Sequence, residues 1–385
     1  MQPWQNSRPS RGASTPRRTF SFEKESDRIG KSEMGIDISP SEMPVLLLSN
    51  LDPEWSTREK AEALDASSQV GEALRAAGFP AALVQVTNSD LDSVLSAYDP
   101  LEYIVVNWCE SLPGVHHSEW LVAEYLEQHG FTFTGAGSAA LASAYDKCHV
   151  KRLLDEAGIL TPAWKLYDKG SSIDWRHFPA IIKPSREHCS AGIHGDSVVM
   201  TATKLKNRVR YVIKRFQHPA LVEDFIDGRE LHVSLWGNRN IGVLPPAEMK
   251  FPWFKDVHYR LCTYESKFVE ESEQYNNIEI VLPAPLSECE LHEVEQVCRT
   301  AYVLMGCRDY ARIDMRMKDG LFYILDINPN ADISPDTSTI YAAELAGYTY
   351  SDFLKRLVLL AAERHPRWES EFVLPVRARS RRASN

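Results

Sequence analysis

Short apolar runs alternate with stretches of helical periodicity from residue 44 onward. Three of these runs are bounded by turn residues and have the length of a buried parallel strand: VLLLSN at 45–50, AALVQV at 81–86 and YIVVNW at 103–108. Helical patterns cover 59–77 and 118–129. Each stops before a glycine, a residue that favours the end of a helix. This alternation predicts an open α/β layer.

The rest of the chain mixes helical patterns with further strands. Three helices are predicted, at 143–157, at 288–304 behind the capping residue Ser287, and at 339–363. FPAIIKPS at 178–185 predicts a strand that runs into a loop. ALVEDFI at 220–226 and ELHVSLWG at 230–237 predict two more strands. The pair Asp227-Gly228 between them indicates a hairpin turn.

Residues 311–330, ARIDMRMKDGLFYILDINPN, predict a β-hairpin whose two faces differ. A three-residue turn at 318–320, with its glycine in the left-handed position, places every odd-numbered position on one apolar or aromatic face. The opposite face carries the polar residues Arg312, Asp314, Arg316, Asp326 and Asn328. A two-residue turn would mix the faces, so burial favours the longer turn. In this register Arg312 faces Asp326, and Asp314 lies diagonally to it.

The polar face of this hairpin has the chemistry of a magnesium site. Asp314, Asp326 and Asn328 offer two carboxylates and an amide oxygen, the hard ligands that Mg²⁺ accepts beside phosphate oxygens. The neighbouring Arg312 suits a phosphoryl group or a developing oxyanion. The alternative is a solvated face with an ordinary Arg–Asp pair.

Composition and charge narrow the class of protein. The 385 residues suffice for two or three packed units, and a hydrophobic content of 44% is typical of a globular chain. The net charge of −10 argues against a general affinity for nucleic acid. No apolar run approaches the roughly 18 residues of a membrane span. The seven scattered cysteines form no CxxC pair, which indicates reduced thiols in a cytoplasmic protein.

Both ends of the chain differ in composition from the rest. Residues 1–43 are rich in Arg, Ser and Pro and have no acidic residue before Glu23, which predicts a flexible tail. This tail faintly resembles an organelle transit peptide but lacks amphipathic periodicity. Residues 369–385 end in RARSRRASN and form a second, basic tail.

Three lysines are candidates for phosphate contacts, although the chain has no P-loop. GxxxxGK[ST] is absent, and GAG at 135–137 lacks the third glycine of GxGxxG. The candidate lysines are Lys147 in DKCHVK, Lys183 at the end of FPAIIKPS, and Lys267 in YESKF. Each of them alone is more commonly a solvated surface group.

Taken together, these pieces resemble the ATP-grasp superfamily, in particular its D-alanine–D-alanine ligase-like branch. The resemblance spans about Val45 to Glu363 and rests on five segments in the same order and spacing: TFTGAGSAALASAYDKCHVKRLLDEAGILTP, FPAIIKPSREHCSAGI, LVEDFIDGREL, YESKF and CRDYARIDMRM with YILDINPN. It implies an α/β (α+β) ATP-grasp fold of three lobes. These are an N-terminal Rossmann-like domain at 44–142, a small lid subdomain at 143–228 and a larger C-terminal subdomain at 229–368, with ATP between two antiparallel sheets.

The resemblance also implies a role for individual residues. Eight residues are implied to line the ATP site: Lys147, Lys183, Glu223, Phe225, Ile226, Glu230, Lys267 and Leu325. Among them the lysines would contact phosphates, Glu223 the adenine amino group, and Glu230 the ribose hydroxyls. Three residues are implied to hold two Mg²⁺ ions, for which Mn²⁺ could substitute: Asp314, Asp326 and Asn328. Three are implied in catalysis: Arg312, which would steady an acyl phosphate, Lys267, and Ser190 of the lid loop at 185–192.

The chain departs from this branch at three places. Asp326 stands where the branch usually has a glutamate that bridges the metal ions. Asp332 and Thr337 stand near the positions at which this branch has a glycine and a serine that receive the carboxylate of the acceptor substrate. A carboxylate at 332 would repel that group or attract an amine, unless it points away as a turn residue. The residues that hold the first D-alanine have no clear counterpart, and the candidates are Glu62, Glu110, His116, His117 and Glu119.

These features predict an ATP-dependent carboxylate–amine ligase that forms an amide or peptide bond through an acyl phosphate and releases ADP and phosphate. The expected substrate is an amino acid or small carboxylate other than D-alanine. Two alternatives stay open: a D-alanine–D-alanine ligase, and a non-catalytic ATP-binding regulatory protein. The expected partners are a small-molecule carboxylate and an amine, without nucleic acid or membrane, and the sequence leaves a homodimer open.

Overall fold

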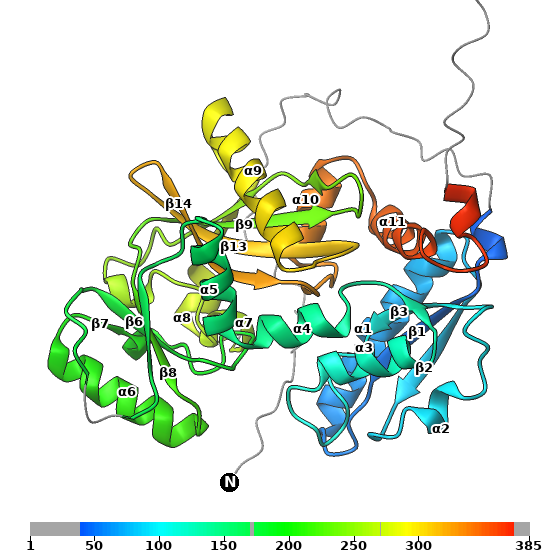
Figure 1. The fold of residues 1–385 in the computed structure, drawn as a ribbon, viewed down its shortest axis with the longest axis horizontal. Coiled ribbons are helices and arrows are strands. Elements are labelled where there is room, and N and C mark those ends of the chain that lie inside the picture. The colour runs from blue at the N-terminus through cyan, green and yellow to red at the C-terminus, as the bar shows by residue number, and fades with distance from the viewer. Residues whose placement is uncertain (1–38, 170–172, 270, 373–385) are drawn as a thin grey trace, which may run out of the picture. The chain divides into compact units, whose positions relative to one another are not determined.

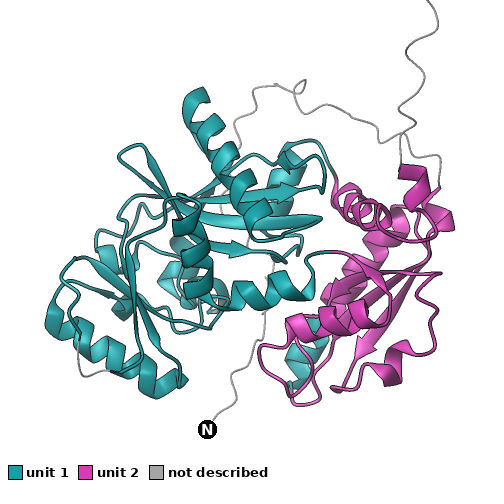
Figure 2. Ribbon diagram, viewed as in Figure 1, with its two compact units in different colours: residues 1–23, 55–63, 135–348 teal, residues 24–54, 64–134, 349–385 magenta. Residues whose placement is uncertain are grey.

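Residues 39–169, 173–269 and 271–372 are described by the structure, a computed structural model, and they divide into two units (Figure 1, Figure 2). One unit contains residues 39–54, 64–134 and 349–372, and the other contains residues 55–63 and 135–348.

Most of each predicted tail lies outside the described residues. Within the stretch predicted as the first tail, η1 (Pro40–Glu42) is a short 3-10 helix and Met43 is fully buried. Within the second, η4 (Glu369–Phe372) is another 3-10 helix. Packed structure therefore reaches a few residues into both predicted tails.

A parallel sheet in the order β2-β1-β3-β4 forms the centre of the unit drawn in magenta in Figure 2. Its strands are β1 (Val45–Asn50), β2 (Ala81–Val86), β3 (Ile104–Trp108) and β4 (Thr132–Phe133). The helices are α2 (Asp92–Leu95), α3 (Glu119–Gln128), α11 (Tyr350–Ala362) and residues 64–76 of α1 (Thr57–Ala76). Leu46, Leu47 and Leu48 of the central β1 are at most 1% exposed, which confirms the buried strand that the continuous apolar run predicts.

The smaller sheet of the unit drawn in teal in Figure 2 is antiparallel, in the order β5-β8-β6-β7. Its strands are β5 (Trp164–Tyr167), β6 (Ala180–Pro184), β7 (Val198–Val199) and β8 (Ala220–Asp224). On one face, Leu205 and Val209 of α6 (Ala202–Phe216) belong to the same buried cluster as Ile182. Because side chains alternate along a strand, Lys183 and Glu223 lie on the opposite face of this sheet.

The larger sheet is also antiparallel, in the order β12-β11-β9-β13-β14, with β10 beside β9. Its strands are β9 (Arg229–Trp236), β10 (Gly242–Val243), β11 (Ala247–Lys250), β12 (Glu279–Val281), β13 (Tyr310–Lys318) and β14 (Leu321–Asn328). One face packs against α9 (Glu288–Leu304) and α5 (Lys147–Glu156) through a core that includes Val233, Ile313 and Ile324. The remaining elements are α4 (Ser138–Tyr145), α7 (Glu265–Phe268), α8 (Glu273–Asn277), α10 (Ser338–Leu345), η2 (Gly195–Ser197) and η3 (Val257–Tyr259).

The hairpin predicted at Asp227-Gly228 is wrong, because β8 and β9 belong to different sheets. β8 pairs with β5 and β6, whereas β9 pairs with β10, β11 and β13. The turn instead carries the chain from the smaller sheet to the larger one. A Cβ at Gly228 would lie 2.2 Å from the carbonyl oxygen of Met317, so the backbone passes close against β13 there and glycine is required.

Two of the predicted helices are each divided in two. The helix predicted at 143–157 is divided at Asp146, where α4 has ended and α5 begins. The side chain of Asp146 caps α5 by accepting hydrogen bonds from the backbone N–H groups of Cys148 and His149, each at 3.0 Å. The helix predicted at 339–363 is divided into α10 and α11 around Gly347, which has a left-handed φ of +92°. The predicted helix at 288–304 is confirmed.

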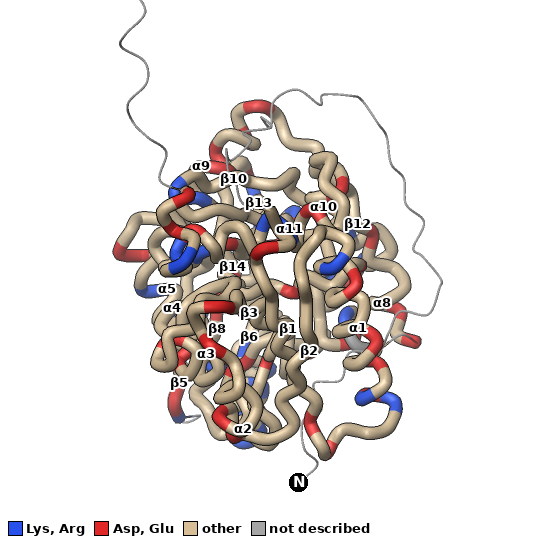
Figure 3. Tube along the Cα trace, turned by 90° about the vertical axis from the view of Figure 1, so that its right-hand side faces the viewer, with Lys and Arg blue, Asp and Glu red and all other residues tan. Residues whose placement is uncertain are grey.

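Acidic and basic residues are interspersed along the elements of both units (Figure 3). Over the ranges that the structure describes, none of the helices combines the length and the apolar character needed to cross a bilayer.

Candidate active site

The hairpin of β13 and β14 closes with a two-residue turn and not with the predicted three-residue turn. The turn residues Asp319 and Gly320 have φ angles of +53° and +78°, as a type I′ turn requires. A β-bulge then adds one residue, Leu325, to β14. The short turn shifts the predicted pairing by one residue and the bulge shifts it by one more, so that even-numbered positions again face each other and Asp314 pairs with Asp326.

The predicted division into odd and even faces therefore holds for β13 and fails for the first half of β14. On β13 the odd-numbered Ile313 and Met315 are buried in the core. On β14 the buried residues are the even-numbered Phe322 and Ile324 before the bulge, and the odd-numbered Ile327 after it. The bulge, which the sequence pattern did not reveal, is the reason for the difference.

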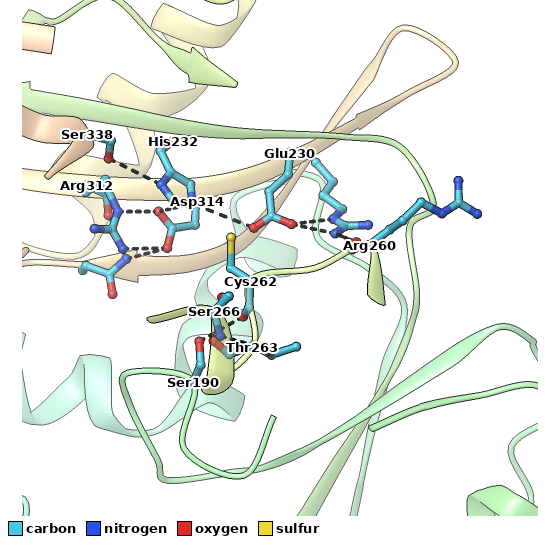
Figure 4. Close-up of polar contacts among 12 residues, drawn as sticks. Ser190, Glu230, His232, Arg260, Cys262, Thr263, Ser266, Arg312, Asp314 and Ser338 are labelled. Atoms are coloured by element: carbon cyan, nitrogen blue, oxygen red, sulfur yellow. Dashed lines mark hydrogen bonds and ion pairs between the residues drawn. The ribbon is translucent and has the colours of Figure 1, made fainter. Parts of the chain in front are cut away.

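Arg312, Asp314 and Asn328 form one hydrogen-bonded group on the polar face, and Figure 4 shows Arg312 beside Asp314. The sequence predicts that Arg312 faces Asp326, but in the structure Arg312 pairs with Asn328 across the strands. Arg312 donates to both carboxylate oxygens of Asp314, at 2.6 and 3.0 Å, and Asn328 Nδ2 donates to Asp314 Oδ2 at 3.2 Å. Burial raises the pKa of Asp314, but the charges of Arg312, His232 and Lys267, with the hydrogen bond from Arg312, together outweigh burial and hold the pKa at about 2, so this group is a carboxylate at neutral pH.

Lys147 and Asp326 form an ion pair that joins α5 to the hairpin. Asp146 caps α5 and so places Lys147 at its first residue, where the Nζ lies 2.6 Å from Asp326 Oδ2. Burial raises the pKa of Asp326, but the charges of Lys147, His188 and Lys183, with the hydrogen bond from Lys147, together outweigh burial, and the pKa lies below its ordinary value. A cation and a candidate metal ligand are therefore adjacent.

A second cluster of cations surrounds Glu223, which is 1% exposed. Lys151 Nζ lies 2.6 Å from one of its carboxylate oxygens, and Lys183 Nζ lies 2.6 Å from the other. Lys151 also donates to Thr161 Oγ1 at 2.6 Å, and this hydroxyl donates to the carbonyl of Ile324 at 2.8 Å. Burial raises the pKa of Glu223, but the two lysines outweigh it and lower the pKa. The carboxylate predicted to meet adenine thus bridges two lysines here.

Arg316 is buried and holds Glu230, the residue predicted to meet a ribose. Its Nε and Nη2 donate to Glu230 Oε2 at 3.1 and 2.6 Å, and its Nη1 donates to the carbonyl of Ile226 at 2.8 Å. The guanidinium carbon lies 4.6 Å from the centre of the Phe225 ring. The predicted adenine and ribose contacts Phe225, Ile226 and Glu230 are thus brought together around one arginine.

His232 lies between the two carboxylates on this face. Its Nε2 is 3.8 Å from Glu230 Oε1 and 3.9 Å from Asp314 Oδ1, and its Nδ1 is 3.4 Å from Ser338 Oγ. Two further segments of the unit drawn in teal in Figure 2 also approach this face. Ser190 Oγ donates to the carbonyl of Cys262 at 3.1 Å, and the charge of Lys267 is among those that lower the pKa of Asp314.

The acceptor-side candidates are less closely tied to this group. Asp332 Oδ1 accepts hydrogen bonds from the backbone N–H and the hydroxyl of Ser334, at 2.9 and 2.7 Å, as a turn residue does. Its charge still contributes to raising the pKa of Arg312. Thr337 is the N-cap of α10, and Glu62 pairs with Arg58 at 2.7 Å. The other candidates belong to the unit with the parallel sheet, and their role stays a prediction: Glu110, His116, His117 and Glu119.

The oxygen donors of the hairpin fit a hard dication. Asp314 and Asp326 face each other on paired strands, at a spacing that brings their carboxylates close together. Asn328 uses its Nδ2 for the bonds to Asp314 and to the carbonyl of Arg312, so these bonds leave its amide oxygen to a ligand. An all-oxygen set with two carboxylates suits Mg²⁺. The cations around this set suit phosphate groups.

Several members of the group were not selected from the sequence. Lys151 lies four residues after Lys147 on α5 and thus on the same helix face, a signal that was available. Arg316 continues the even series of β13, and His232 lies two residues after Glu230 on β9, so strand alternation predicts both positions. Cys262 reaches the group through a long connection and carries no comparable signal.

Comparisons with known proteins agree on one family. The family model described as D-ala D-ala ligase C-terminus matches residues 158–359. An uncharacterised protein of Sinorhizobium fredii is 28% identical over 264 residues, which cover 68% of this chain and 75% of that protein. The D-alanine–D-alanine ligase of Marinomonas sp. is 28% identical over 313 residues, which cover 78% of this chain and 90% of the relative.

A solved structure has the same fold. The structure of D-alanine–D-alanine ligase from Bacillus anthracis complexed with ATP superposes with a TM-score of 0.64 at 18% identity. The match covers 83% of this chain and 97% of that one.

Proposed function

This chain belongs to the D-alanine–D-alanine ligase family of ATP-grasp enzymes, and we propose that it joins a carboxylate to an amine through an acyl phosphate formed from ATP. One observation carries the proposal. Arg312, Asp314 and Asn328 are hydrogen-bonded to one another, and Asp314 faces Asp326, which is itself paired with Lys147. This arrangement combines metal-type oxygens with cations beside them, as phosphoryl transfer requires.

The proposed reaction has two steps. A carboxylate oxygen of the first substrate attacks the γ-phosphorus of ATP, and ADP leaves. The amine nitrogen of the second substrate then attacks the acyl carbon, phosphate leaves, and the amine gives up a proton. Two steps are needed because a carboxylate is a poor electrophile until its oxygen becomes a good leaving group.

In this scheme the cations of the site offset the charge of the phosphates. Lys147, Lys183 and Lys267 contact the triphosphate, and Arg312 steadies the acyl phosphate. Mg²⁺, when bound by Asp314, Asp326 and Asn328, supplies charge neutralisation at the transferred phosphoryl group. Glu230 binds the ribose, Glu223 and the Phe225-Ile226 segment lie at the adenine with Leu325, and the loop of Ser190 closes over the phosphates to exclude water. The proposal thus assigns a role to each residue named in this paragraph.

D-alanine is the first substrate to test for both positions, because the named relatives are D-alanine–D-alanine ligases. The comparisons favour D-alanine over the expectation, drawn from the departures from the family, that the substrate is another amino acid or small carboxylate. A different acceptor is the second candidate, and it rests on Asp332. This carboxylate contributes to the pKa of Arg312, and its charge opposes a carboxylate-bearing acceptor nearby.

Phosphate release tests the proposal. The purified chain is incubated with Mg-ATP and D-alanine, and in parallel with a panel of other amino acids and small carboxylates. We expect release only when a carboxylate and an amine are both present. Binding of Mg-ATP, seen as a thermal shift, without release on any pair would contradict the ligase and support a non-catalytic ATP-binding protein.

Arg312→Ala separates turnover from nucleotide binding. Removing one group that stabilises transition-state charge lowers the rate by about 10²- to 10³-fold, whereas the thermal shift with Mg-ATP should persist. Arg299→Ala is the matched control, because Arg299 also pairs with a carboxylate, that of Glu295 at 3.0 Å, but lies on α9. Equal loss of turnover in both variants would remove Arg312 from the mechanism.

A further inference from the structure

Three side chains beside the hairpin have the donor atoms of a transition-metal site. Glu230 and His232 occupy alternate positions of β9 and so point to the same face, and Cys262 reaches them from the connection between η3 and α7. One ligand atom from each lies within 4.8 Å of the others (Figure 4). Two of the three residues are buried, and Cys262 is half-buried. This trio shares no residue with the all-oxygen set of the hairpin, although Asp314 of that set lies beside it.

The spacing of the donors is close to that of a four-coordinate ion. Ligand atoms at about 2.0–2.3 Å from a tetrahedral ion lie about 3.3–3.8 Å from one another. His232 Nε2 is 3.8 Å from Glu230 Oε1 and 3.9 Å from Asp314 Oδ1. Small side-chain movements would therefore bring these atoms around one ion, with Asp314 or water in the fourth position.

The surrounding contacts orient the donors toward their common centre. Ser338 lies at the Nδ1 of His232 and leaves Nε2 directed at the carboxylates. Arg316 binds the Oε2 of Glu230, while Oε1 is the oxygen that faces His232. Ser190 holds the backbone carbonyl of Cys262 at 3.1 Å. Supporting contacts of this kind are what position the ligands of protein-bound metals.

The chemistry of the donors selects the metal. Mg²⁺ takes oxygen ligands, whereas imidazole nitrogen and thiolate sulfur select Zn²⁺ and similar ions such as Co²⁺. The carboxylates of Glu230 and Asp314 lie beside the charges of Arg312, Arg316 and Lys267, and the thiolate that Cys262 forms on binding adds a third negative charge. The three negative charges then match the three cations, so the metal–ligand bonds provide the attraction for the dication.

We propose that Glu230, His232 and Cys262 bind one Zn²⁺-type dication, and that this ion and the nucleotide exclude each other. The thiol of Cys262 releases its proton to solvent as the metal–sulfur bond forms. The exclusion rests on the proposed function, in which Glu230 binds the ribose, because one carboxylate oxygen cannot serve both partners. Zn²⁺ would thus inhibit the ligase by competing with ATP and not with the amino acid.

Cobalt provides a direct test that does not depend on enzyme activity. The purified full chain is titrated with Co²⁺, and absorption is recorded in the visible and near-ultraviolet range. We expect one equivalent to bind with a thiolate-to-cobalt charge-transfer band. Cys262→Ser should abolish this band, and Cys289→Ser, which removes an exposed and free cysteine of α9, should leave it intact.

A second variant covers the case in which Cys262→Ser fails to fold. Ser338→Ala leaves all three ligands in place and should weaken Co²⁺ binding about 10- to 100-fold, as loss of a supporting hydrogen bond does. A wild-type protein without the band overturns the metal site. A band that survives Cys262→Ser in folded protein, as circular dichroism reports, also overturns it.

Mg-ATP then tests the exclusion separately. We first confirm on cobalt-free protein that Mg-ATP produces a thermal shift, and then add it to the cobalt-loaded protein. Loss of the band supports competition. A band that persists at saturating Mg-ATP overturns the exclusion but leaves the metal site standing. Failure of the proposed function appears instead as the absence of any thermal shift or phosphate release in cobalt-free protein.

Discussion

Lys151 allows a test of how strongly burial determines the energy of an ion pair in this protein. Its Nζ lies 2.6 Å from Glu223 Oε1, and the two side chains are 3% and 1% exposed. Lys151→Met keeps a side chain of similar length and removes its charge. Glu223 then retains Lys183, and Thr161 loses its donor.

The expected loss of stability follows from this geometry. Removing one partner of a buried ion pair destabilises a protein by about 3–5 kcal/mol. Because Lys183 still pairs with Glu223 at 2.6 Å, we expect about 3 kcal/mol, the lower end of that range. At about 2–4 °C per kcal/mol, the unfolding midpoint should fall by roughly 6–12 °C.

Thermal unfolding followed by circular dichroism measures this change, and Lys165→Met is its matched control. Lys165 pairs with Asp174 at the same 2.6 Å, but the side chains are 50% and 62% exposed. Solvent screens such a pair, so we expect no measurable shift of the midpoint in the control. Equal shifts in the two variants would show that burial does not set the energy of these pairs and would refute the reasoning.

Three further predictions concern the turn, a buried histidine and the metal ligands. Gly320→Ala should destabilise by about 1 kcal/mol because its φ is +78°, whereas Gly71→Ala inside α1 should stabilise by about 0.5–1 kcal/mol. Urea unfolding measures both changes, and a stabilised Gly320→Ala or a destabilised Gly71→Ala would contradict the corresponding expectation. His365 is fully buried, and burial lowers its pKa below 6.5 while its Nδ1 accepts the N–H of Arg367 at 3.1 Å. The unfolded chain therefore binds a proton that the folded chain does not, so stability should fall as pH drops through about 6.5. In His365→Gln, the midpoint of urea unfolding should lose that part of its pH dependence. Asp326→Asn should raise the Mg²⁺ concentration for half-maximal phosphate release at least about tenfold, whereas Asp326→Glu should stay near wild type; equal Mg²⁺ requirements would exclude Asp326 as a ligand.

The sequence by itself determined the strongly patterned elements and three polar residues that meet on the hairpin of β13 and β14. The apolar run of β1 is confirmed as a buried strand, and Ser287 begins a helix as predicted. Arg312, Asp314 and Asn328 do share one face, as parity along β13 and β14 indicates. These predictions succeed because burial and capping depend on neighbouring residues along the chain.

Only the tertiary structure decided how these elements pair and which charges meet. The short turn at Gly320 and the bulge at Leu325 together set the register, and neither feature alone would place Asp314 opposite Asp326. The separation of β8 from β9 depends on partners far along the chain, as does the meeting of Lys151 with Glu223. Such contacts are selected by the packing of whole sheets, so a local pattern of hydrophobic and polar residues does not contain them.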